Sequence, residues 1–272
     1  RLAMQGLTDR FGLSGKIALV IGASSGLGRE AALALASAGA NVGLIARRKE
    51  RLLEVGASCS ELGVRTANAA ADVTHRNELA GAVADIDSQL GSIDILLYAA
   101  GIAPLKRAET HPDDKWEAAV QTNLNGAFYA AQIVGQQMIE RATAPDVSWS
   151  GGRIIMISSI MGSHGNPVHR NIGYSASKGG LDNMVRQLAV EWAQYGITTN
   201  AVAPAYFKTE MTIDPSTGEI PAEMEERMRL FSPMGRIGES GELDSSILFL
   251  ASPASSYVNG VILPIDGGWS AW

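Results

Sequence analysis

The sequence is short of several features, and each shortage excludes a class of protein. Its single cysteine, Cys59, cannot form a disulfide within the chain, which is typical of a reducing compartment. The chain has no block of Lys or Arg and a formal net charge of −6, so we expect no nucleic-acid partner. The longest apolar stretch, residues 95–105, is too short to cross a bilayer, so we expect no membrane partner. The first six residues contain no apolar segment of a secretion signal, and we therefore expect a cytoplasmic location.

Apolar residues and glycine are plentiful by contrast. Hydrophobic residues make up 46% of the 272 and charged residues 18%, which supplies a sizeable core and excludes a disordered chain. The 30 glycines come without a collagen period or an excess of proline, so they indicate tight turns and close approaches of the backbone. No repeat or low-complexity linker divides the sequence. We expect one domain over residues 1–272, with residues 1–12 as an N-terminal extension.

Short β-branched runs alternate with longer helical stretches. The expected strands are residues 16–21, 41–46, 64–70, 93–98, 153–158, 197–203 and 261–265. The expected helices are residues 26–38, 50–62, 75–90, 113–122, 124–141, 174–195 and 243–251. Because the strands are apolar throughout, both faces of the sheet must be covered. This predicts an α/β fold, a doubly wound Rossmann-like parallel sheet with helices on both faces.

Two stretches interrupt the alternation. Residues 142–152 are rich in Pro, Ser, Gly and Trp and are expected to form an exposed loop. Residues 204–241 form a long connection with one amphipathic piece near residues 221–231. A long connection beyond a strand end in this fold is expected to be a lid over the substrate site.

Three glycines follow the first expected strand and open the first helix. Backbone N–H groups at such a helix start can bind a phosphate, and Gly22, Gly26 and Gly28 would let it approach closely. Their spacing, Gly-xxx-Gly-x-Gly, differs from the common Gly-x-Gly-xx-Gly pattern. The alternative interpretation is an ordinary glycine-rich turn.

The end of the second strand bears on the choice of cofactor. An acidic residue there would bind an adenosine ribose, whereas arginine accommodates a 2′-phosphate. The sequence has Arg47 and Arg48 at this position and no acidic residue, which favours NADP(H) over NAD(H). A solvated pair at a helix start is the alternative. Asp72, after the third strand, is a candidate acceptor for the adenine amino group or, alternatively, a helix cap ahead of Thr74.

A tyrosine and a lysine lie four residues apart on one expected helix. Tyr174 and Lys178 therefore share a face, and an ammonium group beside a phenol lowers the pKa of the phenol. A tyrosine tuned in this way can exchange a proton with a carbinol oxygen. Ser158 and Ser159 end the fifth strand, where a hydroxyl could hold a carbonyl oxygen or simply form a turn.

Together these pieces resemble the short-chain dehydrogenase/reductase family, over residues 12–272. The matching segments are residues 22–28 (GASSGLG), 72–73 (DV), 100–101 (AG), 123–126 (NLNG), 157–159 (ISS), 174–178 (YSASK), 200–204 (NAVAP) and 266–268 (DGG). The resemblance implies a seven-stranded sheet and an NAD(P)-dependent alcohol dehydrogenase or carbonyl reductase. It also implies roles for four residues: Tyr174 as acid/base, Ser159 orienting the substrate oxygen, Lys178 lowering the Tyr174 pKa and binding the nicotinamide ribose, and Asn123 holding a relay water.

The resemblance also implies which residues line the cofactor and substrate sites. The cofactor site would comprise Gly22, Ser24, Ser25, Gly26, Leu27, Gly28, Arg47, Arg48, Asp72, Val73, Ala100, Gly101, Tyr174, Lys178, Pro204, Phe207 and Thr209. We expect a mostly apolar substrate pocket drawing on Ile160, Met161, His169, Tyr206 and Met211. The four histidines show no metal-ligand spacing, so no metal is expected.

The chain departs from the family pattern at several positions. Ile21 replaces the usual Thr before the first glycine, and Tyr98-Ala99 replaces Asn-Asn, which removes one side-chain tie between strands. Pro204 is followed by Ala205 instead of Gly, and the gap from Ser159 to the tyrosine is longer than usual. These departures concern the rim of the substrate pocket and leave the chemistry intact.

We therefore expect an NADP(H)-preferring oxidoreductase that interconverts a ketone or aldehyde and a secondary alcohol. Three alternatives remain: an NAD-linked polyol or sugar-acid (gluconate-type) dehydrogenase, an enoyl reductase, and a non-catalytic nucleotide sensor. The resemblance further implies a homotetramer or homodimer. Trp269 and Trp272 are expected either at a subunit contact or packed on their own subunit.

Overall fold

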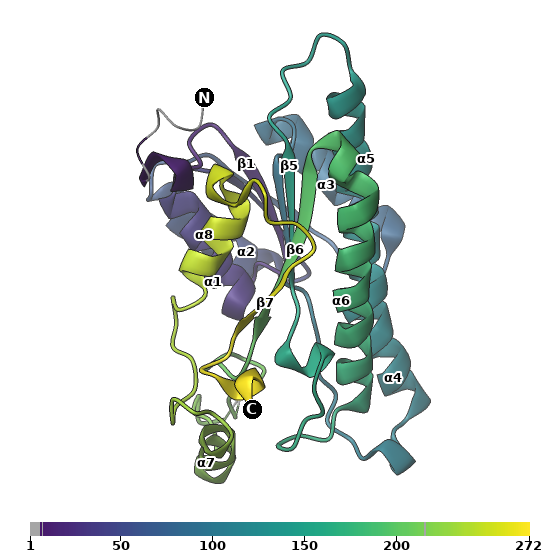
Figure 1. The fold of residues 1–272 in the computed structure, drawn as a ribbon, viewed down its shortest axis with the longest axis vertical. Coiled ribbons are helices and arrows are strands. Elements are labelled where there is room, and N and C mark those ends of the chain that lie inside the picture. Colours follow the sequence, from purple (N-terminus) through teal and green to yellow (C-terminus); the bar gives the residue numbers. More distant parts are fainter. Residues whose placement is uncertain (1–5, 7, 215) are drawn as a thin grey trace.

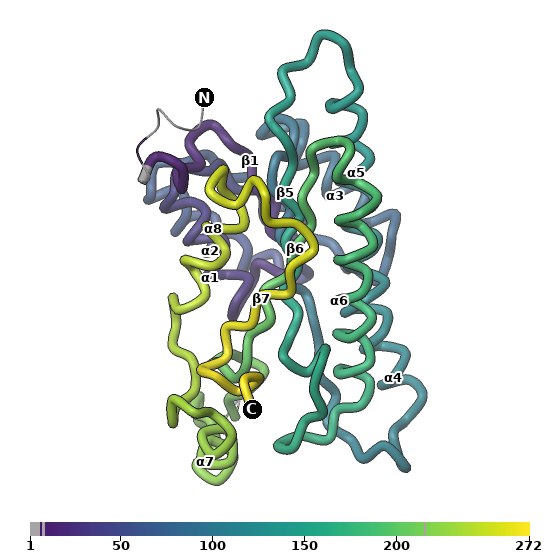
Figure 2. Tube along the Cα trace, viewed as in Figure 1, coloured from purple at the N-terminus to yellow at the C-terminus, as the bar shows by residue number. Residues whose placement is uncertain are grey.

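The strands form a single parallel sheet. The computed structural model describes residues 6, 8–214 and 216–272, so residues 1–5 and 7 of the expected N-terminal extension lie outside the described residues. The described residues form a seven-stranded sheet in the order β3-β2-β1-β4-β5-β6-β7 (Figures 1 and 2). Its strands are β1 (Ile17–Ile21), β2 (Asn41–Ala46), β3 (Thr66–Ala70), β4 (Ile95–Tyr98), β5 (Gly152–Ile157), β6 (Ile197–Pro204) and β7 (Ile262–Ile265). The prediction of a doubly wound Rossmann-like sheet is confirmed.

The strand order reverses beside β1. Every residue of β1 is buried, and its last residue, Ile21, pairs with Ile45 of β2 on one side and with Tyr98 of β4 on the other. The chain winds outward to β3 and then returns to the other side of β1. At such a reversal the loops after the two central strands diverge, which opens a crevice at the carboxyl edge of the sheet.

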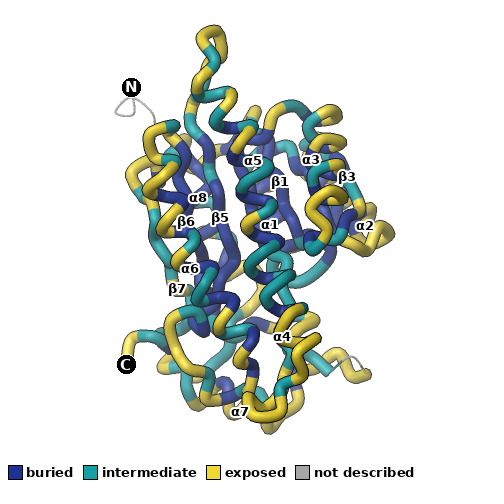
Figure 3. Tube along the Cα trace, turned by 90° about the vertical axis from the view of Figure 1, so that its right-hand side faces the viewer, coloured by how far each residue is buried: buried dark blue, intermediate teal, exposed yellow. Residues whose placement is uncertain are grey.

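Helices cover both faces of the sheet (Figure 1). One face carries α1 (Gly26–Ser37), α2 (Lys49–Ser60) and α8 (Asp244–Ala251). The other carries α3 (Arg76–Leu90), α4 (Asp113–Val120), α5 (Gly126–Thr143) and α6 (Ile172–Trp192). Each face has its own apolar core, one including Leu19, Leu96 and Val134 and the other Val20, Leu35 and Leu97. The strands therefore form the buried middle layer that Figure 3 shows in dark blue.

The expected lid, residues 204–241, lies beyond the carboxyl edge and shares a small apolar cluster with residues 160–168 and Trp269. It contains the helix α7 (Ala222–Leu230), which Figure 1 places beside the C-terminus. Met228 of α7 is buried in a cluster with Met161 and Trp269. Trp269 packs on its own chain, against Tyr206 and Phe231 at ring-centroid distances of 5.4 and 5.3 Å. The subunit-contact interpretation is therefore wrong for Trp269, whereas Trp272 is 80% exposed.

Most boundaries fall close to their predicted positions, with three informative differences. The two helices predicted around residue 123 are joined by a π-helical turn, Gln121–Asn125, so the chain never leaves a helical path. The helix predicted over residues 174–195 begins at Ile172 and gives way after Trp192 to a 3₁₀ turn that ends at Gly196, whose φ is +71°. The loop of residues 142–152 is anchored, because Trp149 Nε1 donates a hydrogen bond to the carbonyl of Tyr195 (2.6 Å).

Two further properties constrain the molecule. Cys59 is a free, fully buried thiol in α2, and burial raises its pKa to about 11. No helix in the described part of the chain is long and apolar enough to span a membrane.

Candidate functional site

The glycine loop between β1 and α1 is shaped by contacts with its own chain. A Cβ at Gly22 would lie 2.5 Å from the backbone nitrogen of Ala100, and one at Gly28 would lie 2.2 Å from the carbonyl oxygen of Gly22. Gly22 and Gly26 also have positive φ angles, +86° and +52°. The absent side chains thus let the loop pack against the segment after β4. This packing directs the N-terminus of α1 toward the crevice, where its free N–H groups can receive an anion.

The two predicted arginines lie beside this loop and point in different directions. Arg47 is 72% exposed, with Nη1 3.8 Å from Asp72 Oδ2. Arg48 turns onto the glycine loop, and its Nη2 donates to Ser25 Oγ (2.6 Å) and Ser24 Oγ (3.1 Å). The solvated-pair interpretation therefore describes Arg47 better than Arg48.

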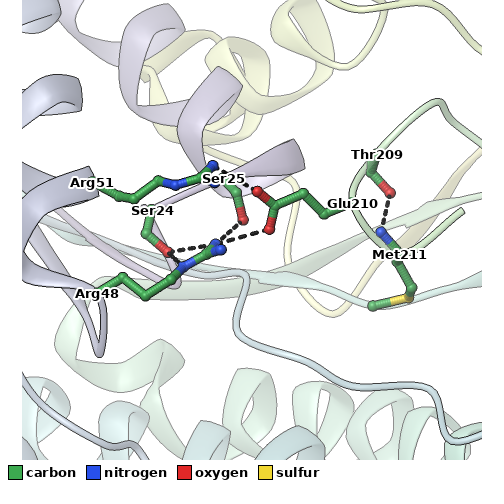
Figure 4. Close-up of polar contacts among 7 residues, drawn as sticks. All are labelled: Ser24, Ser25, Arg48, Arg51, Thr209, Glu210 and Met211. Carbon is green, nitrogen blue, oxygen red and sulfur yellow. Dashed lines mark hydrogen bonds and ion pairs between the residues drawn. The ribbon is translucent and has the colours of Figure 1, made fainter. Parts of the chain in front are cut away.

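Two charged residues that the sequence analysis missed complete this cluster. Glu210 of the lid accepts hydrogen bonds from Arg48 (2.9 Å) and from Arg51 (2.7 Å), as Figure 4 shows. Arg51 lies one helical turn after Arg48, a spacing that could have marked it. Glu210 could not be found this way, because only the fold brings the lid beside α2.

Asp72 caps the start of the connection to α3. Its Oδ1 accepts hydrogen bonds from the backbone N–H (2.9 Å) and hydroxyl (2.8 Å) of Thr74. Burial raises its pKa, but the hydrogen bonds from Thr74 and the charge of Arg47 outweigh burial, so the pKa lies below its usual value. The structure thus contains the capping arrangement, and Asp72 also lines the cavity described below.

Helix α6 presents Tyr174 and Lys178 one turn apart beneath Ser159, which follows β5. Ser159 Oγ accepts a hydrogen bond from the N–H of Met161 (3.2 Å), and its hydroxyl lies close enough to Tyr174 to lower the pKa of the phenol. Lys178 is buried, donates to the carbonyl of Ile157 (2.7 Å), and holds its Nζ 5.6 Å from the centre of the Tyr174 ring. The end of β5 and the first turns of α6 thus bring the three predicted side chains together.

Burial shifts the pKa values of both Tyr174 and Lys178. It raises the pKa of Tyr174, and the Ser159 hydroxyl opposes this effect. Burial lowers the pKa of Lys178 itself to about 8, and the nearby Asp182 carboxylate partly offsets that effect. The ammonium group that should favour the phenolate therefore carries its own desolvation penalty.

Ser158 has a different partner from Ser159. Its hydroxyl donates to Oδ1 of the buried carboxylate of Asp182, one turn after Lys178 on α6. Asp182 was also missed by the sequence analysis, although its i,i+4 spacing from the lysine was visible. Of the two serines, Ser159 faces the tyrosine.

Asn123 lies in the π-helical turn and acts as a clamp between segments. Its Oδ1 accepts from the N–H of Ile102 (2.8 Å), while its Nδ2 donates to the Ile102 carbonyl (2.9 Å) and to Ser177 Oγ (2.9 Å). Both amide protons are used in these bonds. The hydroxyl of Tyr98 holds this turn in place by donating a hydrogen bond to the carbonyl of Thr122 (2.6 Å). Tyr98 therefore ties β4 to the π-helical turn.

One cavity of about 570 Å³ connects the glycine loop with the Tyr174 cluster. Every residue predicted to bind cofactor lines it, and so do Ser159 and the five predicted substrate residues; Asn123 does not. Anion-binding groups lie at one end and hydroxyl and ammonium groups at the other, which is the donor arrangement that an extended dinucleotide requires. No group of three His, Cys, Asp or Glu side chains within residues 6, 8–214 and 216–272 is placed to hold a metal ion.

The substrate end of the cavity carries several polar groups. Asn166, which the sequence analysis missed, organises it: its Oδ1 accepts from the Tyr206 hydroxyl and from the N–H groups of Val168 and His169, each at 3.0 Å. His169 packs edge-on against Tyr206, and burial together with the charge of Arg227 lowers the His169 pKa. These polar groups lie beside a lining that is mostly apolar, as the sequence predicts.

Comparison with known proteins agrees with this geometry. Residues 22–270 match a family model described as "Enoyl-(Acyl carrier protein) reductase". The chain is 38% identical to galactitol 2-dehydrogenase (L-tagatose-forming) of Cereibacter sphaeroides, covering 96% of this chain and 98% of that protein. It is 36% identical to gluconate 5-dehydrogenase of Gluconobacter oxydans, covering 96% of both.

Solved structures show the same fold. A short-chain type dehydrogenase/reductase from Mycobacterium marinum superposes with a TM-score of 0.90 at 33% identity, covering 98% of this chain and 100% of the other. A gluconate 5-dehydrogenase from Burkholderia cenocepacia, in complex with NADP and tartrate, gives a TM-score of 0.89 at 32% identity, with the same coverage. The chain therefore belongs to the short-chain dehydrogenase/reductase family and is an oxidoreductase that uses a nicotinamide cofactor.

Proposed function

We propose that this enzyme interconverts a secondary alcohol and its ketone, with an aldehyde as a further substrate, and that it prefers NADP(H). The observation that carries the proposal is the meeting of Ser159, Tyr174 and Lys178 in the same cavity as the glycine loop.

In this proposal the protein moves the proton and orients the substrate. The Ser159 hydroxyl holds the substrate oxygen, and Tyr174 exchanges a proton with it. Because burial keeps the Tyr174 pKa above its usual value, its hydroxyl is protonated at neutral pH and suited to donate to a carbonyl oxygen. In oxidation Tyr174 would first release its own proton to solvent, and the resulting phenolate oxygen would then accept the alcohol proton. The nicotinamide, when bound, takes up or supplies the hydride with its electron pair.

A polyol or sugar acid is the substrate class that we favour. Asn166, His169 and Tyr206 place hydrogen-bonding groups around the substrate end, which suits a molecule with several hydroxyls. The relatives named as galactitol 2-dehydrogenase and gluconate 5-dehydrogenase support this choice. The enoyl reductase named by the family model is the second candidate.

The proposed NADP(H) preference rests on Arg47, Arg48 and Arg51, with no acidic residue at the end of β2. Planar guanidinium groups bind phosphate oxygens in pairs. The NADP-bound neighbour supports the same choice. We also propose that the chain forms a single domain and assembles as a homotetramer.

A tyrosine variant and a substrate panel test the chemistry. Tyr174→Phe should lower kcat by about 10²- to 10⁴-fold because it removes the proton donor. NADPH affinity, measured by fluorescence titration, should stay within twofold of wild type. Near-normal turnover in the variant would contradict the mechanism.

The panel should contain galactitol and gluconate with NADP⁺ and NAD⁺, and a 3-oxoacyl and an enoyl thioester with NADPH and NADH. We expect the hydroxylated substrates to give the highest kcat/KM. Fastest reduction of the enoyl thioester would favour the second candidate. NADPH binding without turnover of any substrate would indicate a sensor.

A further inference from the structure

A carboxylate from the lid binds the arginines beside the glycine loop. Glu210 offers one oxygen to each guanidinium, Oε2 to Arg48 Nη2 at 2.9 Å and Oε1 to Arg51 Nη1 at 2.7 Å (Figure 4). Arg48 and Arg51 lie in or beside the first turn of α2, whereas Glu210 follows β6. This contact therefore joins α2 to the lid beside the glycine loop.

The position of Glu210 is set by a folded turn. Thr212 Oγ1 accepts from the N–H of Thr209 (2.9 Å) and donates to the carbonyl of Phe207 (2.8 Å). The side chain of Thr209 lies 3.5 Å from the place where a Cβ on Gly26 would be. The segment of residues 209–212 thus rests on the glycine loop next to the ion pairs.

Two positive guanidinium groups, those of Arg48 and Arg51, surround the one carboxylate of Glu210, as in a binding site for a single anion. Hydrogen bonding to Arg48 holds the pKa of Glu210 below its usual value, so it is a carboxylate at neutral pH. One carboxylate between two guanidinium groups leaves one net positive charge. A phosphate monoester carries up to two negative charges and three acceptor oxygens, so it can engage the same two groups more fully. Arg48 and Arg51 cannot satisfy both anions with the same N–H groups.

We propose that Glu210 is a cofactor-specificity residue, whose carboxylate occupies the Arg48–Arg51 pair in place of the 2′-phosphate of NADP(H) and must be displaced when that phosphate binds. The inference rests on the proposed function, which assigns these arginines to the phosphate. NAD(H) has only a ribose hydroxyl there and leaves the ion pairs intact. NADP(H), and not NAD(H), therefore releases the segment of residues 209–212 from α2, so the phosphate end of the cofactor is coupled to the lid over the substrate.

The first test compares two ligands that differ only in the 2′-phosphate. Adenosine 2′,5′-bisphosphate and 5′-AMP would be titrated by calorimetry into wild-type protein, Glu210→Gln and Glu219→Gln. Glu219 is the matched control, because it lies in the same lid but pairs with Lys208. Glu210→Gln should bind the bisphosphate about 3- to 10-fold more tightly than wild type and 5′-AMP equally well. The control should change neither affinity.

A second test follows the release of the lid. Trypsin cleavage after Lys208, which is exposed and adjoins the tethered segment, would be timed by mass spectrometry. In wild-type protein the bisphosphate should speed this cleavage several-fold and 5′-AMP should not. In Glu210→Gln cleavage should already be fast and insensitive to either ligand.

The outcomes separate this inference from the proposed function. If wild-type protein prefers the bisphosphate but Glu210→Gln changes nothing, Glu210 does not compete and the inference fails alone. If Glu210→Gln weakens 5′-AMP binding, the carboxylate serves the ribose hydroxyl and the inference is wrong. Slower or unchanged cleavage with saturating bisphosphate would also overturn it. If neither protein prefers the bisphosphate, the assignment of the arginines to phosphate fails as well.

Discussion

Two adjacent serines at the end of β5 differ in what they contact. Ser159 lies beside Tyr174 and borders the cavity, whereas the Ser158 hydroxyl donates to the buried Asp182. At this strand end successive side chains point to opposite sides, so neighbours in sequence meet different surroundings. We therefore propose that Ser159 serves the reaction and that Ser158 stabilises the fold.

Substituting each serine in turn should separate these roles. Ser159→Ala should lower kcat by about 10²- to 10³-fold and change the free energy of unfolding by less than about 1 kcal/mol. Ser158→Ala should cost about 1.5–3 kcal/mol of unfolding free energy, because it deprives a buried carboxylate of a donor. Urea unfolding and steady-state kinetics on both variants check this. A larger kcat loss in Ser158→Ala would reverse the assignment.

Lys178 gives a pH dependence to stability. Its pKa falls from 10.5 in the unfolded chain to about 8 in the folded one, so between these values the unfolded state binds more protons. Stability should therefore rise with pH from about 8 to about 10.5, by roughly 3 kcal/mol in all. The unfolding free energy of wild type should rise over this range, whereas that of Lys178→Met should not show this rise. A difference independent of pH would show that the ammonium group is not desolvated.

At the scale of elements, glycines decide how closely the parts approach. Gly28 in α1 faces the Gly22 carbonyl, while Gly81 in α3 has nothing within 4 Å of the place where a Cβ would be. Both residues lie in helices, so they share the conformational cost of glycine there but differ in surroundings. Close packing therefore requires glycine at position 28, whereas no neighbour requires it at position 81.

Alanine at these two positions should act in opposite directions. Gly28→Ala should destabilise the protein by about 3 kcal/mol or more, because the new methyl group meets backbone that cannot move aside. Gly81→Ala should stabilise it by about 0.5–1 kcal/mol through helix propensity. Thermal and urea unfolding of both variants provide the measurement. Equal effects would show that the glycine loop can relax.

The elements could be predicted because they depend on local pattern, and the cavity lining could be predicted from the resemblance to a known family. Apolar strands separated by helices imply the sheet, and the carboxyl ends of its strands carry Gly22, Ser159 and the tyrosine helix to one edge. Glu210 and Asn166 could not be predicted, because their partners lie far away in the sequence or in an irregular loop. The raised Tyr174 pKa was also out of reach, since burial depends on the assembled fold.

At the scale of the whole molecule, two long helices carry apolar side chains that are exposed on the surface of the single chain. Phe128 on α5 is 40% exposed and Val190 on α6 is 76% exposed. Both helices cover the same face of the sheet (Figure 1). This agrees with the proposed assembly, in which this face would be covered by a second copy of the chain.

A charge placed on this face should weaken the assembly. We expect wild-type protein to run as a tetramer in light scattering coupled to size exclusion. Phe128→Glu should raise the dissociation constant about tenfold or more. Leu53→Glu, on α2 at the opposite face and 53% exposed in the single chain, is the control and should leave the mass unchanged. A monomeric wild type would exclude the tetramer.

Cys59 has a practical consequence for following the lid in solution. A buried thiol with a pKa of about 11 carries almost no thiolate at neutral pH, so alkylating reagents will not modify it in the folded protein. A cysteine introduced at an exposed lid position such as Met211 would then be the one reactive thiol in the described part of the chain. A fluorophore attached there could report opening and closing in the otherwise native sequence, without first removing a residue from the core.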